Sequence, residues 1–215
     1  MTNPNLTEIV FLLDETGSMT NRRDMTISAF NEMLTSQKGA GDRAKVTLVM
    51  FSLRGPTTPN VRHQFTEDIE EVPELTEEDY VPGGSTPLLD ATGTVISNVG
   101  QRLAELPEEE RPGRVLFVVI TDGLENSSTE YTQEQIEEMV EHQKEKYSWE
   151  FLFLGCEIDA WQSAALGGLR GTQIAQTDHD NYQYTIAKNL SQAVTEYRTS
   201  GSVTGWGNGN GGTTD

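Results

Sequence analysis

Apolar runs alternate along the chain with segments in which apolar side chains recur every three or four positions. Four runs have the length of strands and few polar positions, as expected for strands buried on both faces of a sheet: residues 9–13, 46–51, 115–120 and 151–154. Helical spacing covers five segments: residues 27–34, 88–103, 136–140, 160–166 and 182–197. Strands that alternate with helices predict an α/β domain with a doubly wound, mostly parallel central sheet and helices on both faces.

The remaining segments set the limits of this domain. Residues 62–66 form a shorter and more polar run, which we predict to be a strand at the sheet edge. The acidic stretch 67–80 has the composition of an extended connection. From residue 199 onward the chain is mainly Gly, Ser, Thr and Asn, with Trp206 as its only large apolar side chain. We therefore predict one domain over residues 1–198 and a flexible tail over residues 199–215.

Charge restricts the classes of partner. The 215 residues include 34 acidic and 15 basic side chains, for a formal net charge of −19. Such a chain repels phosphates, so we expect neither nucleic acid nor a membrane surface as a partner. No run approaches the ~20 apolar residues of a membrane span, and the N-terminus has no signal-peptide pattern, so we expect a cytoplasmic protein. The single cysteine, Cys156, excludes a disulfide within the chain and is expected to be buried at a strand end.

Polar segments follow two of the predicted strands and precede one predicted helix. The first segment, residues 14–18, places one carboxylate and two hydroxyls at alternate positions: Asp14, Thr16 and Ser18. The second, residues 83–87, begins a helix with Thr86 as its N-cap. The third contains Asp122, directly after the strand over residues 115–120. Because parallel strands present their carboxyl ends at one edge of a sheet, we expect these segments to converge.

The converging side chains predict a metal site, whose ligands would be Asp14, Thr16, Ser18, Thr86 and Asp122. Two carboxylates and three hydroxyls form an octahedral oxygen site once water fills the remaining position. Hard oxygen ligands of low total charge favour Mg²⁺, and they leave Mn²⁺ and Ca²⁺ open. Each segment alone has an ordinary explanation as a helix cap or a turn. Only their combination in this order indicates a metal.

With these residues the sequence resembles the von Willebrand factor A domains and their metal-ion-dependent adhesion site. The signature of that site is Asp-x-Ser-x-Ser, then a distant Thr, then a distant Asp, and the five predicted ligands match it with Thr16 in place of the first Ser. The pattern Tyr-x-Pro-Gly-Gly-x-Thr-Pro-Leu-Leu-Asp-Ala at residues 80–91 is typical of small standalone bacterial and phage members. The resemblance covers roughly residues 7–198. It implies a Rossmann-like fold with a divalent ion, usually Mg²⁺, at the top of the sheet.

The resemblance also implies a function. Such domains use the metal to bind an Asp or Glu carboxylate of a protein partner. We expect a metal-dependent interaction module and no enzyme, because no general base, nucleophile or phosphate-binding loop accompanies the predicted ligands.

Two alternatives stay open. The first is a Mg²⁺-dependent phosphohydrolase of the haloacid-dehalogenase type with Asp14 as the nucleophile. Against it, Thr16 stands where that class carries its acid–base Asp, and no Lys follows Thr121 at a matching position. The second is a scaffold whose metal only stabilises the sheet edge. Three hydroxyl ligands suit that role poorly, since tight structural sites collect more charge.

Several polar residues beside the predicted ligands have structural explanations. We expect Glu15 to lie at the rim of the site, pointing away from the metal. Asp90 lies in the first turn of a helix, where a carboxylate suits the helix dipole. Glu125 and Asn126 are expected to belong to a loop. The three histidines, at positions 63, 142 and 179, are far apart on polar segments and are expected at the surface.

Overall fold

The computed structural model describes residues 1–55, 60–157, 159–169, 172–204 and 206. Within these residues, one sheet has the strand order β3-β2-β1-β4-β5-β6. Its strands are β1 (Asn3–Asp14), β2 (Arg43–Ser52), β3 (Asn60–Asp68), β4 (Pro112–Thr121), β5 (Glu150–Cys156) and β6 (Gln173–Thr177). All neighbours pair in parallel except β3, which runs antiparallel to β2 at the edge. The predicted doubly wound, mostly parallel sheet is confirmed.

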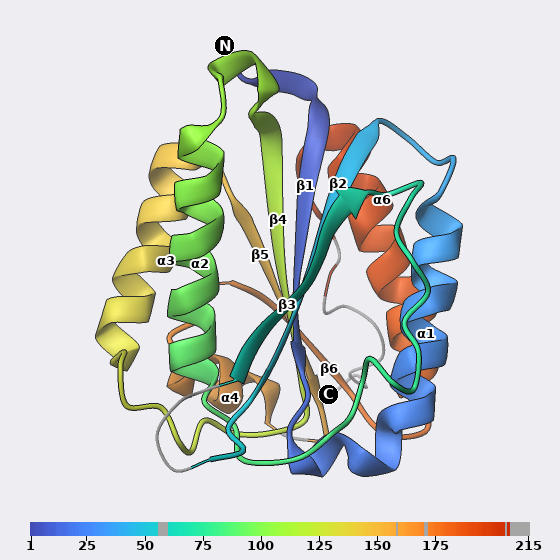
Figure 1. The fold of residues 1–215 in the computed structure, drawn as a ribbon, viewed down its shortest axis with the longest axis vertical. Helices are drawn as coiled ribbons and strands as arrows, with labels where there is room; N and C mark the ends of the chain where they lie inside the picture. Colours follow the sequence, from blue (N-terminus) through green and yellow to red (C-terminus); the bar gives the residue numbers. More distant parts are fainter. Residues whose placement is uncertain (56–59, 158, 170–171, 205, 207–215) are drawn as a thin grey trace, which may run out of the picture.

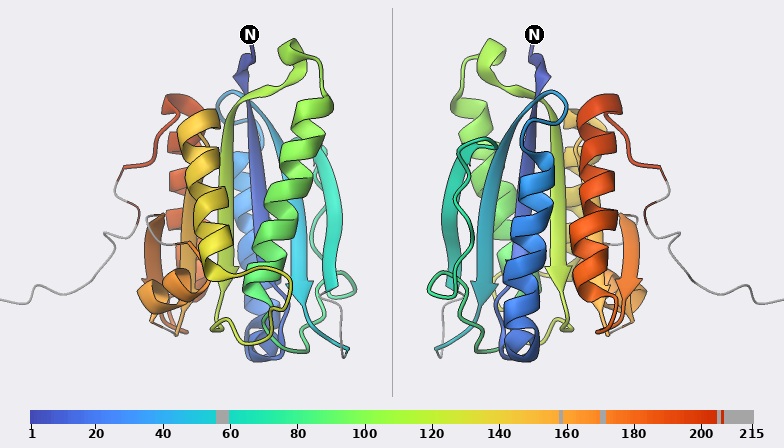
Figure 2. Two further views of the ribbon diagram at one scale, coloured as in Figure 1. Left: turned by 90° about the vertical axis from the view of Figure 1, so that its left-hand side faces the viewer. Right: turned by 90° about the vertical axis from the view of Figure 1, so that its right-hand side faces the viewer.

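Helices cover both faces of the sheet (Figure 1). They are η1 (Gly17–Arg22), α1 (Arg23–Gln37), α2 (Leu88–Glu105), η2 (Glu108–Glu110), α3 (Gln133–Tyr147), α4 (Ala160–Leu166), α5 (Tyr182–Tyr184), η3 (Thr185–Leu190) and α6 (Ser191–Ser200). In Figure 2, α2 and α3 stand before the sheet in the left view, and α1 and α6 in the right view. The last predicted helix is divided between α5, the π-helical η3 and α6.

Strand β1 explains why the sequence shows uninterrupted apolar runs. Successive side chains of a strand point to opposite faces of a sheet. Phe11 and Leu13 accordingly pack in the core beneath α1 and α6, whereas Val10 and Leu12 pack in the core beneath α2 and α3. On the first face, the rings of Phe11 and Phe30 meet edge to face, with their centroids 5.2 Å apart. Both faces of β1 are therefore buried, so apolar and polar side chains do not alternate along residues 9–13.

Three features differ from the sequence-based expectation or extend it. Strand β6 was missed, because its sequence Gln-Ile-Ala-Gln-Thr offers only two apolar residues. The domain boundary predicted at residue 198 lies two residues before the end of α6, and Val203 is buried in the core beyond it. Trp206 also packs against that core. The remaining residues of the predicted tail, 205 and 207–215, lie outside the described residues.

Two other expectations can be compared with the structure directly. Cys156 is the last residue of β5 and is fully buried, as predicted. Across the described part of the chain, no helix has the length and apolar character needed to cross a membrane.

We predict that Leu12→Ala lowers the free energy of unfolding by about 3 kcal/mol, because Leu12 is completely buried in the central strand and its truncation leaves a cavity. Urea unfolding followed by circular dichroism measures the change. The matched control is Tyr184→Ala, a side chain 61% exposed, which should change stability by less than about 0.5 kcal/mol. Equal effects of the two substitutions would contradict the assignment of Leu12 to the core.

Candidate metal centre

The topology of the sheet brings the predicted ligands to one edge. Strand β1 ends at Asp14, and η1, which carries Ser18, follows within three residues. Strand β4 lies beside β1 in parallel and ends one residue before Asp122. The loops that follow β1 and β4 lie at the same end of the sheet, the lower end in Figure 1. Thr86 joins them from the segment that leads into α2.

Direct contacts link these side chains into one cluster. The Thr86 hydroxyl donates to Thr16 Oγ1 at 3.4 Å, and Thr16 Oγ1 lies 3.2 Å from Ser18 Oγ. Ser18 Oγ donates in turn to Asp122 Oδ1 through a short hydrogen bond. The backbone N–H of Thr16 donates to Asp14 Oδ1 at 2.7 Å. The structure thus brings all five residues together, and Ser18 is the exposed member through which the cluster faces solvent.

Asp14 is the most deeply buried member of the cluster, with no exposed surface. Its carboxylate accepts hydrogen bonds from the Thr16 N–H and, at 2.5 Å, from the Thr121 hydroxyl. Burial raises the pKa of Asp14 from 3.8 to about 7, although these hydrogen bonds act in the opposite direction. An ionised carboxylate in this position is unfavourable unless a cation stands near it. The donor set therefore fits a divalent ion on an observation independent of any sequence motif.

Asp122 has a different electrostatic environment. Its Oδ1 accepts from Ser18, and its Oδ2 accepts from Arg22 Nη1 at 2.6 Å. Burial raises the pKa of Asp122, while the Ser18 hydroxyl and the Arg22 guanidinium lower it. Sequence reasoning missed Arg22, which is separated from Asp122 by 100 positions along the chain.

Glycines allow the loops to approach one another closely. The N–H of Gly17 donates to the carbonyl oxygen of Gly84 at 2.9 Å, which joins the first and second predicted segments. Gly84 has φ = +88°, and a Cβ there would lie 2.2 Å from the carbonyl oxygen of Leu53. A Cβ at Gly123 would lie 2.9 Å from Thr86 Oγ1. Only glycine satisfies the backbone and the spacing at Gly84.

From the sequence, Glu15 is expected at the rim of the site, and this expectation is wrong. Glu15 is buried, with a relative exposure of 1%. One carboxylate oxygen lies 2.9 Å from Arg62 Nη2 and accepts from the N–H of Val81, also at 2.9 Å. The other oxygen lies 3.2 Å from Arg54 Nη2. Glu15 therefore fastens the segment that leads to Thr86 onto the end of β1.

Asp90, Glu125 and Asn126 hold the loop after Asp122 against α2, so the structural roles predicted for them agree with the structure. The Asp90 carboxylate accepts from three backbone N–H groups, those of residues 129–131. The Asn126 side-chain oxygen accepts from the N–H of Thr86 at 3.0 Å. Glu125 accepts from an N–H in the first turn of α2.

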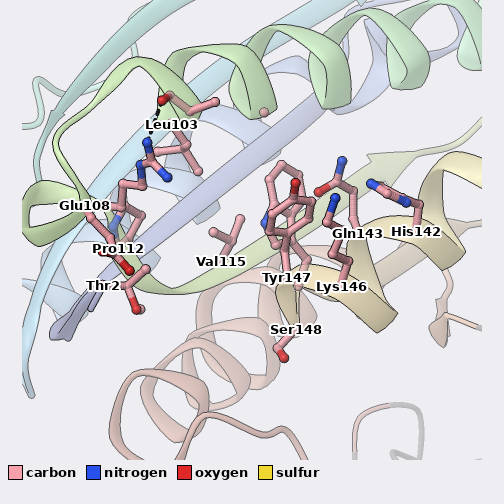
Figure 3. A pocket seen from close by; sticks show the side chains of 15 residues that line it. Thr2, Leu103, Glu108, Pro112, Val115, His142, Gln143, Lys146, Tyr147 and Ser148 are labelled. Atoms are coloured by element: carbon pink, nitrogen blue, oxygen red, sulfur yellow. Dashed lines mark hydrogen bonds between the residues drawn. The ribbon is translucent and has the colours of Figure 1, made fainter.

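A cavity of about 590 Å³ lies at the opposite end of the sheet, between the C-terminal ends of α2 and α3. Figure 3 shows His142, Lys146 and Tyr147 of α3 on one side of it and Leu103 of α2 on the other. None of the five predicted ligands lines this cavity. Among the described residues no group of three or more His, Cys, Asp or Glu side chains could hold a metal ion. The predicted site, with two carboxylates and three hydroxyls, is of another kind.

The family model of the von Willebrand factor type A domain matches residues 8–197 of the sequence. The chain belongs to this family. Its members are in general metal-dependent modules that mediate protein–protein interactions. The comparison with curated proteins finds no match.

Solved structures with the same fold come from several organisms. The pilus adhesin SpaC from Lactobacillus rhamnosus GG matches with a TM-score of 0.62 and 13% identity over 91% of this chain and 31% of its own. A von Willebrand factor type A protein from Catenulispora acidiphila matches with a TM-score of 0.58 and 12% identity, over 92% of this chain and 43% of its own. The ArnB paralog VWA2 from Sulfolobus acidocaldarius matches with a TM-score of 0.53 and 13% identity, over 91% of this chain and 46% of its own. This von Willebrand factor A domain thus spans less than half the length of each, and the likeness shows the fold alone.

The buried carboxylate of Asp14 makes the stability of the metal-free domain depend on pH. In the folded state the Asp14 carboxyl keeps its proton up to about pH 7, whereas in the unfolded chain it releases the proton near pH 3.8. The free energy of unfolding should therefore fall as pH rises from 4 to 7, by up to about 4 kcal/mol from this residue. Urea unfolding in EDTA, compared between the wild type and Asp14→Asn, measures this contribution. Identical pH dependence of the two proteins would show that Asp14 is ionised in the folded state throughout this range.

Proposed function

We propose that this domain binds a protein partner through a divalent metal ion held at an adhesion-type site. Asp14, Thr16, Ser18, Thr86 and Asp122 would hold the ion, and an Asp or Glu carboxylate of the partner would complete it. The observation that carries the proposal is a connected cluster of side-chain oxygens. The hydroxyls of Thr86, Thr16 and Ser18 lead to the carboxylate of Asp122, and the Thr16 N–H binds the fully buried carboxylate of Asp14. Family membership supports the same function.

The donor set favours Mg²⁺ and an additional anionic ligand. All five side chains offer hard oxygen atoms, and three of them are neutral hydroxyls. Arg22 already offsets the charge of Asp122. An ion bound here would keep much of its positive charge and would supply a position that attracts an anionic oxygen. Mn²⁺ and Ca²⁺ remain alternatives, since hardness alone does not separate them.

The net charge of −19 has to be reconciled with an acidic ligand. Long-range repulsion disfavours a partner that is acidic over its whole surface. Close to the site, however, the guanidinium groups of Arg54 and Arg62 lie against Glu15 with side chains 40% and 35% exposed. We therefore propose a partner that presents a single carboxylate on an otherwise neutral or basic surface.

Binding of Mg²⁺ tests the site directly. Titration calorimetry should give saturable binding to the wild type, no binding to Asp14→Ala, and affinity at least about tenfold lower for Thr86→Ala, because each change removes an oxygen ligand. Asp68→Asn is the matched control, since it removes a carboxylate at the far end of β3, where Asp68 is opposite Lys45 near the start of β2. Wild-type affinity in Asp14→Ala would refute the proposed ligands.

Stability gives a second readout of the same proposal. A ligand that binds only the folded state stabilises it by about 2.7 kcal/mol at a concentration one hundred times its Kd. Mg²⁺ should therefore raise the midpoint of urea unfolding of the wild type and of Asp68→Asn, and should leave that of Asp14→Ala unchanged.

We also propose that the domain catalyses no phosphoryl transfer. A phosphohydrolase of the haloacid-dehalogenase type needs a carboxylic acid at the position of Thr16. Thr16 offers only a hydroxyl there, which lies against the hydroxyls of Ser18 and Thr86. In Mg²⁺, the wild type and Asp14→Asn should hydrolyse p-nitrophenyl phosphate no faster than buffer. Turnover by the wild type that Asp14→Asn abolishes would establish the enzyme instead.

A further inference from the structure

Arg22 is a buried cation inside the cluster of predicted metal ligands, and the sequence motif does not include it. It is the last residue of η1, the helix that also carries Ser18, and its relative exposure is 7%. Its guanidinium has three partners. Nη1 donates to Asp122 Oδ2 at 2.6 Å, Nε donates to Cys156 Sγ at 3.2 Å, and Nη2 forms a short ion pair with Glu157.

Because of Arg22, the two carboxylates of the site are electrically unlike. Both oxygens of Asp122 are bound by residues of η1, one by the Ser18 hydroxyl and the other by the Arg22 guanidinium. Asp14 accepts its hydrogen bonds from an N–H and a hydroxyl, which bring no positive charge. A charge-assisted hydrogen bond of this kind holds its partner strongly and fixes its direction. Asp122 is thus paired with a cation within the protein, and Asp14 is not.

Glu157 completes the arrangement from the surface. It directly follows the last residue of β5, its side chain is 48% exposed, and its backbone has φ = +55°. This conformation is uncommon for a residue other than glycine and persists where the surrounding structure holds it. Here the Glu157 N–H donates to the carbonyl oxygen of Thr177 at 2.9 Å, and the carboxylate contacts Arg22. Arg22 therefore lies between one buried and one half-exposed carboxylate.

We propose that Arg22 is a built-in counter-cation that weakens binding of the metal alone and makes tight binding depend on the partner's carboxylate. The inference rests on the proposed function. With Arg22 present, Asp122 is paired with a cation and Asp14 is not, and the half-exposed Glu157 offsets Arg22 only in part because water screens its charge. A divalent ion bound here therefore keeps positive charge that an anionic ligand neutralises. Without Arg22, the ion would already be neutralised by Asp14 and Asp122, and the partner's carboxylate would add little.

A purely structural role of Arg22 predicts the opposite result. If the guanidinium only holds Asp122 in position, its removal leaves Asp122 misplaced and Mg²⁺ binds more weakly. If it acts through its charge, its removal takes a positive charge away from a dication, and Mg²⁺ binds more tightly. The sign of the change in affinity therefore separates the two roles.

The experiment is titration calorimetry with Mg²⁺ alone on four variants of the full chain. Arg22→Gln should bind Mg²⁺ at least about tenfold more tightly than the wild type, and Arg22→Lys, which keeps the charge, should stay within about threefold of it. Glu157→Gln removes the outer carboxylate that offsets Arg22 and should bind Mg²⁺ several-fold more weakly. Arg43→Gln removes a surface charge at the start of β2, at the other end of the sheet, and should behave as the wild type.

Coupling to a carboxylate is measured by repeating the titrations in saturating acetate. Acetate should tighten Mg²⁺ binding to the wild type and to Arg22→Lys by a larger factor than to Arg22→Gln, because only in the first two does the bound ion keep an uncompensated charge. An equal factor in the wild type and Arg22→Gln would overturn the proposed coupling.

The remaining outcomes are also decisive. Unchanged or weaker Mg²⁺ binding by Arg22→Gln overturns the inference and leaves the proposed function standing. Equally tight binding by Arg22→Lys and Arg22→Gln overturns it as well, since the charge would then be irrelevant. If Arg22→Gln does not fold, the half-exposed Glu157→Gln decides by the direction of its change. Absence of Mg²⁺ binding in the wild type would overturn the proposed function and this inference together.

Discussion

The parallel pairing of β1 with β4 is the constraint on which the rest of the molecule depends. The two central strands are buried on both faces and run in register from Thr7–Arg114 to Leu13–Ile120. They therefore end at the same level, where Asp14 is the last residue of β1 and Asp122 directly follows the last residue of β4. The same burial that stabilises the sheet thus places two carboxylates side by side at its edge, in the low-dielectric surroundings where their charge matters most.

The polar groups around this edge compensate for the burial of the carboxylates, which the pairing of the strands causes. A buried carboxylate needs hydrogen-bond donors, and Asp14 finds them in the Thr16 N–H and the Thr121 hydroxyl. The surrounding loops pack closely because Gly84 leaves room for the backbone of Leu53 and Gly123 leaves room for the side chain of Thr86. Glu15 and Asp90 then fix the loops from behind, through arginines and backbone N–H groups. Even with these hydrogen bonds, burial raises the pKa of Asp14 to about 7, and this unfavourable burial of a charge is what a cation at the proposed site would relieve.

How much the sequence reveals depends on whether a feature is local. Strand β1 could be predicted because residues 9–13, buried on both faces, form an unbroken apolar run. The five candidate ligands could be predicted because they stand in short motifs at the ends of elements. Strand β6 could not, since a short strand with two apolar residues has no distinct pattern. The positions of Glu15 and Arg22 were equally hidden. Arg22 meets Asp122 and Cys156 across 100 and 134 positions, and no local pattern encodes such contacts.

The proposed binding of a carboxylate by so acidic a domain depends on local charge rather than on net charge. In physiological salt, electrostatic interactions in water decay over about 8 Å. The acidic helix η2, residues 108–110, precedes β4 and so lies at the other end of the sheet, beyond that range. An approaching ligand meets the field of the site itself. There Arg22 offsets the charges of Asp122 and Glu157, and Arg54 and Arg62 offset the charge of Glu15. Under the proposed function, the net charge therefore disfavours acidic surfaces at a distance, and a divalent ion held at the site would attract a single carboxylate at contact.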